Sequence, residues 1–334
     1  MQFYKLIKLN KLISNFRLKF LGLLILHVFK KRYLAIHLDP VNACNLRCKM
    51  CYFTDEDYVK KLKGIFKEQD IQFIANAFFK RAVKLQIGCG TEPTLFKDIT
   101  EIIKSAKQAQ VPYISLTTNA NKISYDKLES WVINGLNEIT ISLHGVTKTS
   151  YENFMDKGDF DLFMKSLKII TKIKQKHLLT LRINYTFNQD NFEELKDFYT
   201  VFDGVNFDYL QIRPIKKLGN TSYNNFSLDR ITPIYNSTLE HLKKESIKRN
   251  VNLIAHNPFQ LQNRKSTGSL INKYVYCYIS PTQKFKKDFK WHEETYHQYA
   301  SRTHITKQLI KDIFAKKSTV EKLKSDKLNY EVNS

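Results

Sequence analysis

The sequence predicts an α/β fold: a partial (β/α)6 TIM-like barrel with a basic N-terminal helix and a C-terminal α+β extension. Two observations lead to this prediction. Between residues 33 and 214, short apolar runs that suit buried strands alternate with longer segments of helical periodicity. The alternation stops at Pro214. A chain of 334 residues has room for such a barrel and for additions at both ends.

The expected strands are short, and a helix is expected between each strand and the next. Consecutive strands should therefore be parallel, with right-handed crossovers. The expected strands are 33–38, 83–87, 113–118, 138–143, 179–187 and 207–213. The expected helices between them are 65–81, 98–109, 125–133, 160–175 and 192–202.

Four regions follow from this pattern. Residues 1–32 are expected to form a basic amphipathic helix, and residues 33–214 the barrel core. Residues 215–305 are expected to form the extension, with a helix over 231–249 and an irregular stretch with candidate strands over 252–278. The Lys-rich segment 306–334 should be a surface helix over 306–328 and a tail.

The chain is strongly basic, with 54 Lys and Arg against 32 Asp and Glu, a formal charge of +22. This charge favours anionic partners such as nucleic acid, anionic lipid or a phosphorylated substrate. Lysine predominates over arginine, the residue preferred for reading phosphates and bases, so the charge is interpreted as compositional and specific nucleic-acid binding is not expected.

Residues 17–32 form an apolar run between basic residues. The run is shorter than the ~20 residues needed to span a bilayer, and no small-residue cleavage site follows it. Two interpretations remain open: a helix docked on the barrel, or an interfacial helix on an anionic membrane surface. The expected location is the cytoplasm, with peripheral contact to the inner face of the membrane under the second interpretation.

Three of the five cysteines, Cys44, Cys48 and Cys51, lie within eight residues of one loop after the first strand. An odd count in a long chain does not suit a secreted disulfide framework and favours a reducing compartment. Cys thiolates are the usual ligands of [4Fe-4S] clusters, and three ligands leave the fourth iron open. The alternative is a zinc site, which normally has four ligands and could recruit His37.

The spacing Cys-x-x-x-Cys-x-x-Cys, followed by the aromatic Tyr52, resembles the signature of the radical S-adenosylmethionine (SAM) superfamily. A second match follows the second strand, where residues 88–94 read Gly-Cys-Gly-Thr-Glu-Pro-Thr and resemble the family's Gly-Gly-Glu-Pro loop. The resemblance covers residues 33–214. It implies one [4Fe-4S] cluster on Cys44, Cys48 and Cys51.

By the same resemblance, several residues would bind SAM. Gly90 and Glu92 would bind its amino group and Ser142 its carboxylate or ribose, and Arg182 or Asn184 would add polar contacts to SAM or to the substrate. Ile212 would contact adenine. The cofactor-binding residues implied are Tyr52, Gly90, Glu92, Ser142, Asn184 and Ile212.

The roles of five further residues stay open. They are Cys89, His144, Arg182, Arg213 and Cys277. Arg213 would suit an anionic substrate group, and Cys89 is interpreted as a buried thiol. The region 274–278 resembles the start of a SPASM or twitch domain, but the other cysteines of such a domain are absent. Cys277 alone cannot hold a cluster, so the extension is expected to be a metal-free cap or remnant.

The resemblance implies an enzyme that reductively cleaves SAM to a 5′-deoxyadenosyl radical, which abstracts hydrogen from a substrate. A reductant such as flavodoxin or ferredoxin would supply the electron. The SPASM-like arrangement favours a peptide substrate, and the basic apolar N-terminus favours a lipid-linked or glycan-linked one. The alternatives are a non-catalytic iron–sulfur or zinc-binding module and an RNA-modifying radical SAM enzyme.

Overall fold

The computed structural model describes residues 12–215, 218, 220–221, 223, 227–256, 270–283 and 285–321. Within them, eight parallel strands form a single open sheet in the order β7-β6-β5-β4-β3-β2-β1-β8. The strands are β1 (Leu34–Leu38), β2 (Ala82–Ile87), β3 (Ile114–Thr118), β4 (Glu138–Leu143), β5 (Thr180–Phe187), β6 (Tyr209–Pro214), β7 (Asn252–Ile254) and β8 (Tyr276–Ile279). The partial TIM-like barrel is confirmed, and all six expected strands are present.

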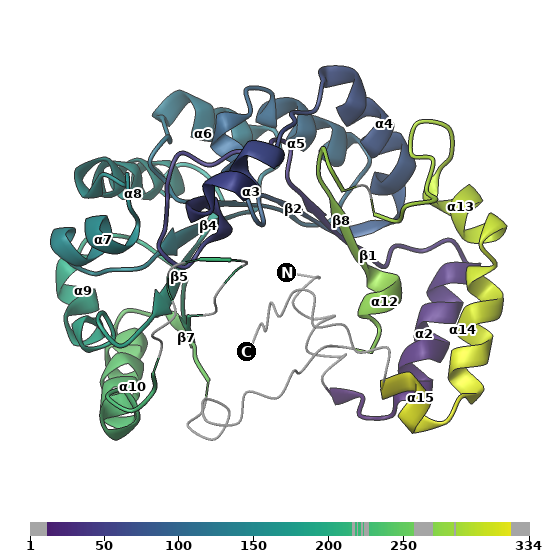
Figure 1. The fold of residues 1–334 in the computed structure, drawn as a ribbon. Coiled ribbons are helices and arrows are strands. Elements are labelled where there is room, and N and C mark those ends of the chain that lie inside the picture. The colour runs from purple at the N-terminus through teal and green to yellow at the C-terminus, as the bar shows by residue number, and fades with distance from the viewer. Residues whose placement is uncertain are drawn as a thin grey trace.

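Figure 1 shows the sheet as an arc with helices along its outer side. The helices that alternate with the first strands are α3 (Glu56–Lys61), α4 (Glu68–Phe78), α5 (Ile99–Gln108), α6 (Tyr125–Ile133), α7 (Lys148–Phe154), α8 (Phe160–Lys174) and α9 (Phe198–Val201). Short 3₁₀ turns complete these connections: η1 (Tyr52–Thr54), η2 (Phe79–Arg81), η3 (Pro93–Leu95) and η4 (Glu193–Asp197). The helix expected over 192–202 is therefore a 3₁₀ turn followed by one α-helical turn.

Local sequence signals explain where the longer helices begin. Asp159 caps α8 by accepting a hydrogen bond from the backbone N–H of Leu162, and Asp161 lies in the first turn. Lys172 and Lys174 lie in the last turn of α8, where cations are favourable. Its apolar residues recur on one face and include the buried Phe163 and Ile170.

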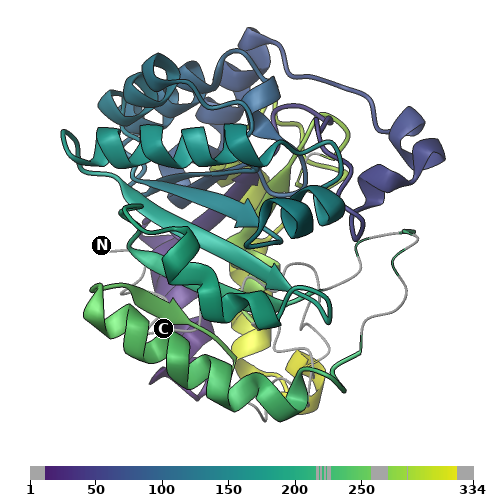
Figure 2. The same cartoon turned by 90° about the vertical axis from the view of Figure 1, so that its left-hand side faces the viewer.

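The C-terminal extension adds one strand to each edge of the sheet. Strand β7 pairs with β6, and β8 pairs with β1, so six expected strands become eight. The extension also contains α10 (Thr232–Lys248), α12 (Asn272–Val275) and α13 (Tyr296–Arg302). Figure 2 shows α10 alongside β7, on the outer side of that edge. The boundary predicted at residue 214 stays a prediction, and strands from beyond it belong to the same sheet.

The helix expected over 306–328 is divided in the structure into α14 (Ile305–Phe314) and α15 (Lys317–Glu321). Ala315 between them has an extended backbone, which ends α14. Residues 322–334 lie outside the described part of the chain.

The expected N-terminal helix is α2 (Phe16–Val28), and residues 1–11 lie outside the described part. Helix α2 packs against α14, and the ring of Phe20 meets Tyr274 of α12 edge to face at 6.0 Å. Both helices lie beside the β8 edge of the arc (Figure 1). Within the described residues, no helix has the length and apolarity to cross a bilayer.

Side chains alternate between the two faces of each strand, and this alternation separates core from site. The outward face carries Ile36, Leu85, Leu116 and Ile141, which are buried in the hydrophobic core. The opposite face, here called the lumen face, carries mainly polar residues. They include His37, Gln86, Ser115, Thr117, Glu138, Thr140, Ser142, Arg182, Asn184, Thr186, Tyr209, Gln211, Arg213, Tyr276 and Tyr278.

Candidate functional site

The cysteine loop leaves the C-terminal end of β1, the end of a barrel where active sites are built. Cys44, Cys48 and Cys51 are half-buried along it. The backbone N–H of Leu46 donates to the Cys44 sulfur at 3.4 Å, and Cys51 N–H donates to the Cys48 carbonyl at 2.8 Å. Arg47 donates to the carbonyl oxygens of Cys44 and Leu46, which fixes the turn between the first two thiols.

Burial of the three thiols raises their pKa values, to about 12 for Cys44. The charges of Cys44 and Cys51 raise the pKa of Cys48 further, so the three groups lie within electrostatic reach of one another. Among the described residues, no three His, Cys, Asp or Glu side chains are arranged around one metal ion. Cys thiolates are the usual ligands of [4Fe-4S] clusters, so the chemistry of this donor set fits one.

The loop after β2 lies directly against the cysteine loop. The backbone N–H of Glu92 donates to the Ala43 carbonyl at 2.9 Å, and the Tyr52 hydroxyl donates to the Gly90 carbonyl. A Cβ at Gly90 would lie 2.7 Å from the Tyr52 hydroxyl oxygen, so the contact depends on glycine. The structure thus brings Tyr52, Gly90 and the three cysteines together.

Asp39, at the end of β1, organises the same loop. Its fully buried carboxylate accepts hydrogen bonds from the backbone N–H groups of Cys89 (2.7 Å) and Gly90 (3.0 Å) and from the Tyr278 hydroxyl (2.8 Å). Burial raises the pKa of Asp39, and the three donors oppose that rise. Asp39 therefore joins β1, the β2 loop and β8 at one point.

Glu92 is buried and already holds four hydrogen bonds from the protein. One carboxylate oxygen accepts from the Thr94 N–H (3.1 Å), the Thr94 hydroxyl (2.6 Å) and the Thr118 hydroxyl (2.7 Å). The other accepts from the Asn119 N–H (2.8 Å). Burial raises the pKa of Glu92, which these donors oppose. Glu92 thus ties the β2 and β3 loops together, and its second oxygen retains acceptor capacity.

Ser142 and Asn184 occupy paired positions on β4 and β5 and share the lumen face. Asn184 is buried, and its Oδ1 atom has no hydrogen-bond partner among the described residues. A buried acceptor of this kind normally has a partner, so it is suited to a bound ligand. Ile212 has the opposite orientation: it is 1% exposed and lies in the core, on the same face as Leu210. The structure does not bring Ile212 to the site.

His144 and Arg213 lie near the C-terminal ends of β4 and β6. His144 Nδ1 lies 3.5 Å from the Thr186 carbonyl, and Asn191 donates to the His144 carbonyl at 2.8 Å. Burial, with the charge of Arg213, lowers the pKa of His144 to about 4. The imidazole is therefore neutral near pH 7, and Arg213 supplies a cation beside it.

The opposite end of the lumen face holds a network of buried charges. Arg182 pairs with Glu138 at 3.3 Å and lies over the Tyr209 ring, 4.6 Å from its centroid. Glu138 also accepts from the Tyr113 hydroxyl at 2.6 Å, and its charge opposes the lowering of the Lys84 pKa by burial. Arg182 is therefore part of this network and not of the group formed by Ser142 and Asn184.

The other two cysteines, Cys89 and Cys277, have different surroundings from the three in the loop after β1. The Cys89 sulfur lies 3.3 Å from His37 Nδ1, and the His37 ring packs against Tyr276. His37 therefore pairs with Cys89 in the structure. Cys277 is buried in the core, on the outward face of β8.

Asp39 and Tyr278 are site residues that the sequence did not reveal. An Asp directly after the first strand and before Pro40 is a visible signal, because acidic groups there can reach the loops at the C-terminal end of the sheet. Tyr278 had no such signal, because its contact with Asp39 spans 239 positions of sequence.

The sequence was compared with family models and with curated proteins. The model of the radical SAM superfamily matches residues 38–211. A probable GTP 3′,8-cyclase of Metallosphaera sedula is 28% identical over 217 residues, 64% of this chain and 63% of that protein. One from Saccharolobus solfataricus is 28% identical over 184 residues, 55% of this chain and 58% of that protein. The chain therefore spans about three fifths of the length of these two relatives.

Solved structures share the fold at low sequence identity. Streptococcus suis SuiB has a TM-score of 0.60 at 16% identity, over 82% of this chain and 71% of SuiB. The enzyme anSMEcpe with bound AdoMet has a TM-score of 0.58 at 18% identity, over 86% of this chain and 85% of that chain. At these identities the similarity shows the fold alone.

Proposed function

This chain belongs to the radical SAM superfamily and is an enzyme of that class, and from that premise we propose that it reductively cleaves SAM at one [4Fe-4S] cluster held by Cys44, Cys48 and Cys51. When bound, the cluster and SAM supply an electron and a 5′-deoxyadenosyl radical that abstracts hydrogen from the substrate. The chain's own residues hold and orient these groups and exclude water from them.

One observation carries the proposal: the cysteine loop and the β2 loop are hydrogen-bonded to each other. Glu92 N–H to the Ala43 carbonyl, and the Tyr52 hydroxyl to the Gly90 carbonyl, are the two bonds. These bonds support the proposal, because they hold a loop with remaining acceptor capacity beside the three thiols.

The proposed SAM-binding residues follow from this arrangement. The Gly90 carbonyl accepts from Tyr52 and has a second lone pair for the SAM ammonium group. The second oxygen of Glu92 is available in the same way, and Asn184 Oδ1 is an unpaired acceptor on the lumen face beside Ser142. Tyr52, Gly90, Glu92, Ser142 and Asn184 are therefore proposed to bind SAM. No role toward adenine is proposed for Ile212.

The substrate is proposed to enter from the C-terminal end of the strands. The Arg182–Glu138 pair with Lys84 and Tyr113 forms a charged network at the other end, and charged groups held there would be costly to displace. Arg213 beside neutral His144 is a suitable contact for an anionic or polar group near the entrance. The candidate substrates are a peptide or a lipid-linked or glycan-linked molecule.

The curated relatives add a further candidate, because their names state that they act on GTP. GTP carries anionic phosphates that Arg213 could bind. GTP as a candidate substrate rests on the sequence similarity over 217 residues and on the cationic side chain of Arg213. The proposed electron donor is flavodoxin or ferredoxin.

The test is anaerobic reconstitution with iron and sulfide, followed by measurement of 5′-deoxyadenosine from SAM under reducing conditions. The triple variant Cys44→Ala/Cys48→Ala/Cys51→Ala should lose both cluster absorbance and product. Cys277→Ala is the matched control, since that thiol lies in the core, and it should retain both. Bound zinc with intact SAM in the wild type would contradict the proposal and favour a non-catalytic module.

Substrate classes are then separated by adding GTP, peptides, glycan-linked or lipid-linked molecules, or RNA to the active enzyme. A true substrate that carries deuterium at the attacked carbon should transfer that deuterium to 5′-deoxyadenosine. RNA is expected to give no such transfer, and transfer from RNA would support the RNA-modifying alternative.

A further inference from the structure

Helix α2 is apolar on both of its sides, and the part of the chain that the structure describes covers only one of them. Phe20 and Leu23 are buried towards the core, and α14 packs along the helix. The other side carries the residues that we call the apolar stripe. Its members are Leu18 (55% exposed), Leu21 (42%), Ile25 (50%), Val28 (55%) and Phe29 (69%).

The stripe is a continuous surface because its members recur at helical spacing. Positions 18, 21, 25 and 28 are three or four residues apart, so they share one face of the helix. At ~1.5 Å per residue, the stripe is roughly 16 Å long. A helix that is apolar all round is normally buried, so this face is suited to a further partner.

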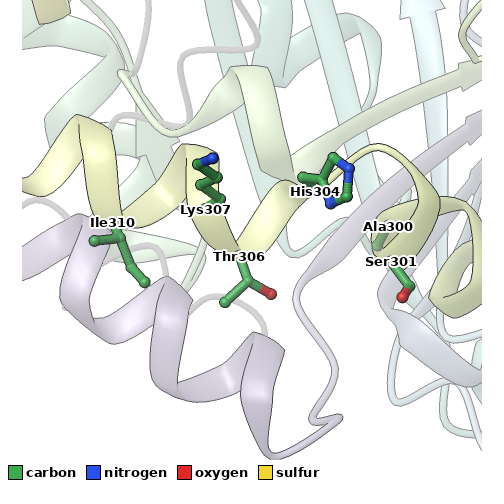
Figure 3. A pocket seen from close by; sticks show the side chains of 6 residues that line it. All are labelled: Ala300, Ser301, His304, Thr306, Lys307 and Ile310. Atoms are coloured by element: carbon green, nitrogen blue, oxygen red, sulfur yellow. The ribbon is translucent and has the colours of Figure 1, made fainter.

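A neighbouring surface continues the same chemistry on α14. Ile310 is 44% exposed and Phe314 is 79% exposed. Figure 3 shows Ile310 and Thr306 on the side of α14 that is turned towards α2. A hollow of about 370 Å³ adjoins them, lined by Ala300, Ser301, His304, Thr306, Lys307 and Ile310. The surface therefore combines large apolar side chains with lysine.

Positive charge predominates around the stripe. The described residues 12–38 contain five Lys and Arg and no Asp or Glu. Arg17 is exposed at the start of α2, and Lys30 and Lys31 are exposed just after its end. On α14, Lys307 and Lys311 are exposed, whereas Asp312 is half-buried and paired with Lys273 and the Tyr274 hydroxyl.

We propose that the apolar stripe of α2, with its basic flanks, docks this enzyme on an anionic lipid membrane surface. Such a surface offers an apolar layer for the stripe and negative headgroups for the flanking cations. A second copy of the chain suits the stripe less well, because a twofold dimer through this face would bring two sets of positive charges together. The docking does not depend on the SAM chemistry.

The test is cosedimentation of the full-length protein with vesicles of phosphatidylcholine, with and without phosphatidylglycerol. Binding to the anionic vesicles alone is expected, and it should weaken as salt rises. Leu21→Glu/Ile25→Glu should lower the partition coefficient by roughly tenfold or more, since it places carboxylates in the apolar layer. Arg17→Gln/Lys31→Gln should weaken binding mainly at low salt.

Leu178→Glu is the matched control, because Leu178 is 97% exposed in the turn between α8 and β5, away from the stripe. It should bind vesicles like the wild type, and circular dichroism should show all variants folded. Absence of wild-type binding, or equal loss in Leu178→Glu, would overturn the proposal. So would sedimentation velocity showing a dimer that Leu21→Glu/Ile25→Glu dissociates, because a second copy would then occupy the stripe.

Discussion

Replacement of Asp39 by Asn tests how the β2 loop is held. The two carboxylate oxygens accept from different donors: Cys89 N–H on one, and Gly90 N–H with the Tyr278 hydroxyl on the other. An amide has the same shape but only one acceptor oxygen. In either orientation, its NH₂ group must therefore face a backbone N–H that can only donate.

The cost can be worked out bond by bond. A hydrogen bond to a charged group contributes about 1.5–3 kcal/mol, and a buried N–H left without a partner costs about 1–3 kcal/mol. Removing a buried charge offsets part of this loss, so we expect a net destabilisation of about 2–4 kcal/mol. Tyr278→Phe removes one donor and leaves both backbone bonds, so about 1.5 kcal/mol is expected.

Urea unfolding followed by far-ultraviolet circular dichroism measures both variants on the protein as isolated. With a urea dependence of about 3 kcal/mol per molar, Asp39→Asn should lower the midpoint by roughly 1 M. The reconstituted variant should also bind SAM more weakly, because Gly90 is no longer fixed. An unchanged midpoint for Asp39→Asn, or a larger loss for Tyr278→Phe, would refute the reasoning.

Three further predictions concern other parts of the barrel. Gly88 has a φ of +80°, and a Cβ there would lie 2.5 Å from the Thr117 carbonyl oxygen, so Gly88→Ala should destabilise the protein by more than about 2 kcal/mol. A Cβ at Gly22 on α2 would lie in open space, so Gly22→Ala should stabilise the protein by up to about 1 kcal/mol. Thermal unfolding compares the two variants. The pKa of His144 is lowered to about 4 in the folded protein, whereas a His in the unfolded chain has a pKa of ~6.5. Between these two pH values the unfolded chain binds a proton at His144 that the folded protein does not bind. His144 alone should thus lower stability by about 2 kcal/mol from pH 7 to pH 5, and a pH series of urea midpoints should show a flatter decline for His144→Gln. Arg182→Met removes the guanidinium group that pairs with the buried Glu138 carboxylate and should cost about 3–5 kcal/mol in urea unfolding. Arg182→Met/Glu138→Gln should restore much of this loss, and equal losses in both variants would count against the ion pair.

The barrel core could be predicted because its signals are local. The strand over Glu138–Leu143 has the predicted bounds, and the other five differ by no more than two residues at either end. Each is a short apolar run between helices with clear periodicity. The helices over 125–133 and 160–175 also matched closely, because their apolar faces are clear in the sequence and Asp159 caps the second.

The edges of the sheet could not be predicted in the same way. Strand β8 is only four residues long, and it belongs to the sheet because it pairs with β1, more than 200 positions earlier. No local pattern specifies such a partner. The same limit applies to Tyr278, whose value to the site comes only from that pairing.

Within the site, the register of each strand decides which face of the sheet a predicted residue occupies. Asn184 and Ile212 were both predicted to bind SAM, yet register places Asn184 beside Ser142 and Gln211, whereas Ile212 lies one position out of phase. The motif order predicted the strand and not the side to which the residue points. A shift of one residue moves a side chain to the other face.

The pairing of β8 with β1 and the packing of α14 on α2 also set an order of events during synthesis. Residues 16–38 leave the ribosome more than 200 residues before their partners at 276–279 and 305–314. Until those partners are made, one edge of the growing sheet and the apolar sides of α2 are exposed, and such contacts between distant segments form slowly. A nascent chain is therefore prone to aggregate until residues 276–314 are made, and deletion of α14 should also impair the docking of α2.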